Sequence, residues 1–333
     1  MNETDSRSLM GALVGDGLFL LVLCGFALVF AGGFAILQAL SGQFLPHDAL
    51  ALQMDTAALA RVGNRHLVHF MFHDRVAFGG TLLAIGFGYA WLAEFPLRAG
   101  QAWAWWSLAC SGAVGFASFL AYLGYGYLDT WHGVATLVLL PAFSVGLWRS
   151  GQRLPDPLTW RQMFRPPMRS EPRVGWWGRM LLLTCAGGLA LAGVAIVFVG
   201  MTFVFVPQDL AFMSLTAEQI LRISPRLVPV IAHDRAGFGG GLCSTGLLVG
   251  FIAWHAPITR SFVEITLLMG ICGFGAALGV HVAIGYLDFM HLAPAYAGVG
   301  MFLSGVCFCG VALRQRGDLV RLTCPTSGRA GPE

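Results

Sequence analysis

The sequence contains little charge and no lysine. Charged residues make up 11% of its 333 residues, and all 20 basic residues are arginine. The formal net charge is only +3, which argues against a nucleic-acid partner. Hydrophobic residues, in contrast, reach 56%. A soluble domain of this length cannot bury so much apolar surface, so the composition predicts an integral membrane protein whose main partner is the lipid bilayer.

Two further features are missing. None of the 8 cysteines belongs to a Cys-x-x-Cys motif, and most lie inside apolar runs. We therefore interpret them as small buried hydrophobic residues, which excludes a disulfide framework and a cysteine zinc site. The first five residues are not basic, so we expect the apolar run that follows to be a first membrane helix and not a cleaved signal peptide.

The long apolar segments predict an all-α fold. A membrane helix needs about 20 residues, and eight segments meet this requirement, near 17–40, 70–93, 102–123, 129–148, 180–204, 231–254, 262–283 and 290–312. We expect a first four-helix unit at 1–148, a linker rich in arginine and proline at 149–179, a second four-helix unit at 180–313, and a disordered tail at 314–333.

A duplicated motif relates the two units. His-Asp-Arg-x-x-Phe-Gly-Gly begins at His73 and again at His233. Phe-x-Pro-x-Asp precedes each copy and Gly-Tyr-Leu-Asp-x-x-His follows each. Four spans per unit bring both units into the membrane in the same direction, so the pattern predicts two parallel repeats. The motif glycines lie inside spans, where they favour close helix packing.

The arginines predict the orientation. With a cytoplasmic N-terminus, fourteen arginines fall in the inner segments and six in the outer ones, which agrees with the positive-inside rule. We expect both termini and the linker 149–179 to be cytoplasmic, in a bacterial cytoplasmic membrane. All the duplicated polar motifs then lie at the outer, extracytoplasmic face. They mark the starts of spans, beneath the two long loops 41–69 and 205–230.

The candidate site consists of histidine and aspartate at these span starts. Asp129 and His132, like Asp288 and His291, are three residues apart and share a helix face, where a carboxylate can orient an imidazole. The candidate catalytic residues are His73, Asp74, Asp129, His132, His233, Asp234, Asp288 and His291. The candidate metal ligands are His66, His69, His73, His132 and His281, and the supporting residues are Arg75, Arg235, Asp48, Asp209, Tyr127 and Tyr286.

The histidines are distributed unequally between the two units. His66 and His69 have no histidine counterpart in the second unit, and His281 has none in the first. We therefore expect one principal site weighted toward the spans 70–93 and 129–148. A plainer interpretation remains for the carboxylates, because an aspartate at the start of a helix can cap it and complement its dipole.

Histidine inside a membrane segment is costly and usually functional. The leading hypothesis is a membrane enzyme or redox protein that binds iron, zinc or copper, or haem, and acts on a small molecule or a lipid. One alternative is a secondary transporter in which the same residues carry protons or bind a solute. A second alternative is a non-catalytic subunit of a membrane complex.

Overall fold

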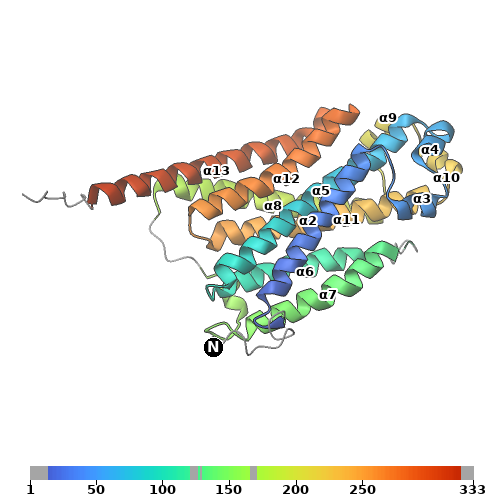
Figure 1. Cartoon of the computed structure of the whole chain (residues 1–333). Helices are drawn as coiled ribbons and strands as arrows, with labels where there is room; N and C mark the ends of the chain where they lie inside the picture. Colours follow the sequence, from blue (N-terminus) through green and yellow to red (C-terminus); the bar gives the residue numbers. More distant parts are fainter. Residues whose placement is uncertain (1–13, 121–126, 128–129, 166–170, 324–333) are drawn as a thin grey trace, which may run out of the picture.

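Helices provide all the regular secondary structure in the residues that the computed structural model describes, which are 14–120, 127, 130–165 and 171–323. Two long series of helices follow one another, each interrupted after its first member by two short helices (Figure 1). The first series is α2 (Leu18–Leu40), α3 (Pro46–Leu52), α4 (Thr56–Val62), α5 (Arg65–Leu92) with a π-helical end η2 (Ala93–Leu97), α6 (Ala102–Leu120) and α7 (Thr130–Gly151). After the 3₁₀ turn η4 (Trp160–Met163), the second series is α8 (Arg173–Met201), α9 (Pro207–Met213), α10 (Ala217–Ile223), α11 (Leu227–His255), α12 (Arg260–Ile284) and α13 (Phe289–Thr323).

Seven of the described helices are long and apolar enough to cross a bilayer, namely α2, α5 with η2, α7, α8, α11, α12 and α13. This confirms the prediction of a polytopic helical membrane protein. The remaining expected span, 102–123, coincides with α6, whose end borders residues outside the described part of the chain. The final helix contains Pro294 near its start and continues to Thr323, past position 314.

The helices α5 and α11 form the centre of the bundle. Within their most apolar windows 78% and 72% of the residues are buried, against 17–28% for the other spans. Each packs against helices of its own series and also across the molecule, α5 against α12 and α11 against α6 (Figure 1). The cores of the two series are therefore joined, and the motif on each central helix lies beside helices of the other series.

The motif glycines permit this close packing. A Cβ atom at Gly79 would lie 2.8 Å from the carbonyl oxygen of Gly32 in α2, and one at Gly239 would lie 2.7 Å from the carbonyl oxygen of Gly193 in α8. Backbones approach this closely only where side chains are absent. Gly79 and Gly239 thus allow each central helix to approach the first helix of its own series, whereas Gly80 and Gly240 face α12 and α6 of the opposite series.

The four short helices cover one end of the bundle, at the right of Figure 1. The side chain of Asp55 caps α4 by accepting a hydrogen bond from the amide of Ala58 at 2.6 Å, and Thr216 caps α10. We call these four short helices the cap. It is held together across the two series, because the side-chain amide of Asn64 donates a hydrogen bond to the backbone carbonyl of Met213 at 2.7 Å. Asn64 also caps α5, which is why this helix begins early enough to carry His66, His69 and His73.

Candidate metal centre

Three histidines meet beneath the cap formed by α3, α4, α9 and α10. His73 comes from α5, His281 from the end of α12, and His291 from the first turn of α13. One ring nitrogen from each lies within 4.8 Å of the others, and the Nε2 atoms of His73 and His281 are 3.0 Å apart. His73 and His281 are buried and His291 is half-buried. The chain is thus a polytopic helical membrane protein with a buried cluster of three imidazoles that could hold a metal ion.

The other ring nitrogens of two of these histidines already have acceptors. Nδ1 of His73 lies 3.0 Å from Oδ1 of Asp74, and Nδ1 of His281 lies 2.6 Å from the carbonyl oxygen of Ala277. A carboxylate and a carbonyl accept hydrogen bonds and do not donate them, so Nδ1 carries the proton in both rings. The two Nε2 atoms therefore face each other at 3.0 Å, and a shared proton or a metal ion between them would satisfy both.

A column of stacked rings supports His291. Tyr286 stacks on His291 with centroids 4.5 Å apart, Phe212 stacks on Tyr286 at 4.5 Å, and His66 stacks on Phe212 at 5.1 Å. The hydroxyl of Tyr286 donates to Asp209 at 3.0 Å. Burial, and next the charge of Asp209, raise the pKa of Tyr286 well above its ordinary value. Tyr286 therefore stays protonated and fixes the ring plane of His291.

Arg75 lies one residue beyond the carboxylate that contacts His73, but it pairs with the opposite series. Its guanidinium donates to both carboxylate oxygens of Asp234, at 3.0 and 3.2 Å, and also contacts Asp48. All three side chains are buried. A two-pronged contact of this kind fixes geometry as well as charge, so Arg75 ties α5 to α11.

Arg235 makes the corresponding contacts from α11. It lies 2.7 Å from Asp209 and 3.4 Å from Asp74. Four carboxylates and two guanidinium groups therefore form one buried network next to the histidines. With neutral histidines this network carries two excess negative charges, which are costly to bury without a compensating cation. The surrounding charge thus favours positive charge at the imidazole cluster, whether from a proton or from a metal ion.

His233 and Asp288 lie outside the group of three histidines. Nδ1 of His233 is 3.1 Å from Asp234, and its ring packs edge-on against Tyr127, whose hydroxyl donates to Asp48 at 3.3 Å. Asp288 is exposed and accepts a hydrogen bond from the amide of His291 at 2.7 Å; this is the helix-capping role given above as the plainer interpretation.

Two of the predicted residues cannot be placed and two lie apart from the cluster. Asp129 falls outside the described residues, as does the side chain of His132 in the first turn of α7. His66 is exposed on the aromatic column and His69 is half-buried. Neither belongs to the group of three histidines.

Among the described residues, the histidine group draws on both helical series. The sequence predicted a site weighted toward spans 70–93 and 129–148, whereas the described residues bring His73 of the first series to His281 and His291 of the second. The reason is the packing of α5 against α12. The Asp-x-x-His spacing was enough to name His291 as a candidate site residue. It carries no information on which other helix packs against His291.

Comparison with known proteins adds no further assignment. No protein-family model, curated protein or solved structure matches the chain. The histidine cluster and its buried charged network are therefore the features that point to a function.

Proposed function

We propose that this protein holds a divalent transition-metal ion on His73, His281 and His291 and uses it in metal-assisted or redox chemistry at the extracytoplasmic face of the membrane. The observation that carries the proposal is the pair of Nε2 atoms 3.0 Å apart, with both Nδ1 atoms donating elsewhere. Metal-binding histidines are commonly oriented in this way, by a carboxylate on one ring and a backbone carbonyl on another.

The ligand set indicates the class of metal. Three imidazoles suit zinc, copper, iron or nickel and not calcium or magnesium, which prefer oxygen. Tetrahedral zinc with Zn–N distances of about 2.0–2.1 Å separates its ligand atoms by roughly 3.3 Å. The two Nε2 atoms are within a few tenths of an ångström of that spacing. A porphyrin does not fit between them, so the geometry favours a single ion over a haem.

A metal ion at this cluster would have a defined chemical role. His73, His281 and His291 would hold the ion, and such an ion would lower the pKa of a bound water or polarise a substrate carbonyl. Asp74 would hold the proton of His73 on Nδ1 and raise the basicity of Nε2. Asp48, Asp209 and the two arginines would keep the carboxylates in position.

Metal analysis of purified protein tests the site. We expect about one transition-metal ion per chain in the wild type. The His73→Ala and His281→Ala variants should retain far less metal. Loss of a residue that only hydrogen-bonds to a metal ligand typically weakens binding by about 10–100-fold, and loss of the ligand itself should weaken it more. His66→Ala is the matched control, since this exposed histidine lies on the same helix outside the cluster. Elemental analysis by mass spectrometry gives the metal content, and wild-type protein without metal would overturn the proposal.

We also propose that the two helical series are parallel repeats with pseudo-twofold symmetry. Supporting this, short helices follow the first long helix in each series. The Arg75–Asp234 and Arg235–Asp74 pairs are reciprocal, and Tyr127 and Tyr286 contact corresponding carboxylates, Asp48 and Asp209.

The arginine distribution supports cytoplasmic termini and a cytoplasmic linker, with the cap outside. The test uses single cysteines in a cysteine-free background and an impermeant thiol reagent on intact cells. We expect Ala57→Cys, on α4, to be labelled from outside. Trp160→Cys, in the linker, should be labelled only after lysis. The reverse pattern would contradict this orientation and place the histidine cluster on the cytoplasmic side.

A transporter is the second candidate, and one observation favours it. Buried arginines and aspartates on spanning helices are typical of proton and solute pathways, and here they join the two series. A metal-free protein whose reconstituted vesicles move protons in a His73-dependent manner would favour transport over the metal centre.

A further inference from the structure

We propose that the linker between the two series binds the head group of an anionic phospholipid, with phosphatidylglycerol as the best-fitting class. This site is separate from the histidine cluster. It lies at the opposite end of the bundle from the cap, where α7 ends and α8 begins (Figure 1). If the bilayer covers the spanning helices α7 and α8, the ends of these helices place the linker at the level of the lipid head groups.

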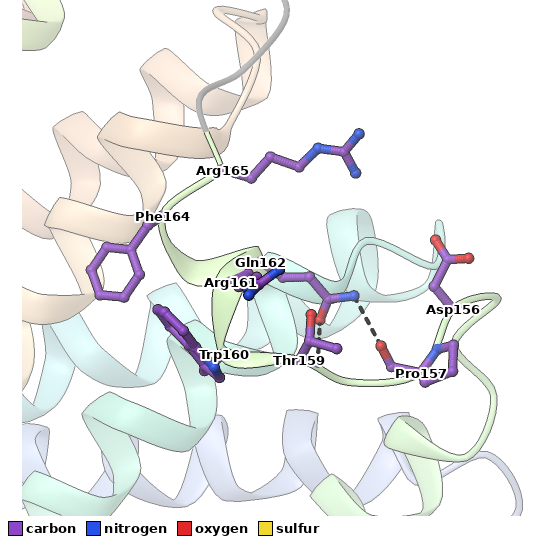
Figure 2. A pocket seen from close by; sticks show the side chains of 8 residues that line it. All are labelled: Asp156, Pro157, Thr159, Trp160, Arg161, Gln162, Phe164 and Arg165. Atoms are coloured by element: carbon purple, nitrogen blue, oxygen red, sulfur yellow. Dashed lines mark hydrogen bonds between the residues drawn. The ribbon is translucent and has the colours of Figure 1, made fainter.

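The linker contains an open hollow on its surface. A surface hollow of about 520 Å³ is lined by eight consecutive or near-consecutive residues (Figure 2), namely Asp156, Pro157, Thr159, Trp160, Arg161, Gln162, Phe164 and Arg165. Pockets of about 300–1,000 Å³ are typical of small-molecule sites. The hollow is therefore large enough for a phosphoglycerol head group.

Hydrogen bonds hold the walls of this linker pocket in place. The Gln162 side chain accepts from the amide of Thr159 at 2.9 Å and donates to the carbonyl of Pro157 at 3.1 Å (Figure 2). The loop is also fastened to both series. The indole of Trp106 in α6 donates to Gln162 at 3.3 Å, and Nε2 of His255 in α11 contacts the carbonyl of Met163 at 2.9 Å. A pocket anchored in this way loses little conformational entropy when a ligand binds.

The chemistry of the lining matches an anionic lipid. Arg161 and Arg165 are exposed, and neither forms an ion pair with a carboxylate among the described residues; the Arg161 guanidinium lies over the Trp160 ring, 5.8 Å from its centroid. They are available for a phosphate, which guanidinium groups bind in a two-pronged manner. Asp156 provides an acceptor for a hydroxyl of the head group. Trp160 and Phe164 are 63% and 66% exposed and project from the same side of the loop (Figure 2), in the manner of aromatic anchors at a membrane interface.

The charge of the whole linker also favours an anionic ligand. The linker 149–179 has seven arginines and only two acidic residues. One of the two, Glu171, is neutralised by Arg179 through two contacts of 2.6 Å. The remaining charge at this end of the bundle is strongly positive, which attracts anionic lipid over zwitterionic lipid.

Native mass spectrometry of the full-length protein in detergent tests the proposal, with phosphatidylglycerol and phosphatidylcholine as probes. We expect the wild type to retain one phosphatidylglycerol preferentially. The double variant Arg161→Gln with Arg165→Gln should bind it about 30-fold more weakly, the effect of two basic side chains near an anionic surface. Arg153→Gln is the matched control, because this exposed linker arginine does not line the pocket.

Three outcomes would overturn the proposal: equal retention of the two lipids, equal affinity in the double variant and the control, or displacement of the lipid by millimolar glycerol 3-phosphate. The last result would assign the pocket to a soluble phosphate ester. Metal content should be unchanged in all three proteins, so a failure here leaves the histidine site unaffected. The substituted side chains are exposed, and a monodisperse elution profile checks folding.

Discussion

Replacing Arg75 by methionine is expected to lower the free energy of unfolding by about 3–5 kcal/mol, the effect of removing one partner from a buried ion pair. The substitution leaves Asp234 and Asp48 buried without their shared guanidinium. Arg75→Lys should give a smaller loss, because an ammonium group keeps the charge but cannot make the two-pronged contact. Unfolding by SDS in a fixed detergent, followed by circular dichroism, measures both variants.

Arg260→Met provides the control for this experiment. Arg260 contacts Glu264 at 2.7 Å one helical turn away, but both side chains are largely exposed, and exposed pairs contribute little. We expect no measurable change in stability. Similar losses in the free energy of unfolding for the Arg75 and Arg260 variants would contradict a stabilising ion pair between α5 and α11.

Asp74→Asn is expected to weaken metal binding by about 10–100-fold, the range typical of groups that orient a metal-binding histidine. Asparagine can still accept a hydrogen bond from Nδ1 of His73, but it no longer supplies the negative charge that raises the basicity of Nε2. A competition titration with a zinc-responsive dye measures the affinity.

Asp234→Asn is a closely matched control, because Asp234 makes the corresponding contacts in the other half of the network. It lies 3.1 Å from Nδ1 of His233 and pairs with an arginine of the opposite series. Both variants should lose stability, whereas only Asp74→Asn should lose metal affinity. The metal centre is assigned to His73 and excludes His233. Equal metal affinities in the two variants would contradict this assignment.

The sequence was sufficient for the membrane class and for the approximate position of each long helix. Apolar runs of about 20 residues are a local property, and a helix satisfies its own backbone hydrogen bonds in lipid. The duplicated motifs also identified the polar residues that the structure gathers beneath the cap, including His73, Asp74 and Arg75. Their position at span starts follows from local composition alone.

The membership of the histidine cluster was decided by tertiary structure. His73 and His281 are separated by 208 residues, and their meeting depends on how α5 packs against α12. Glycine contacts such as Gly79 with Gly32 allow the close approach of central helices, but a single sequence does not state which helices pair. Local pattern therefore determined the spans and their chemistry. Packing between distant helices decided which imidazoles share a site and which carboxylate each arginine neutralises.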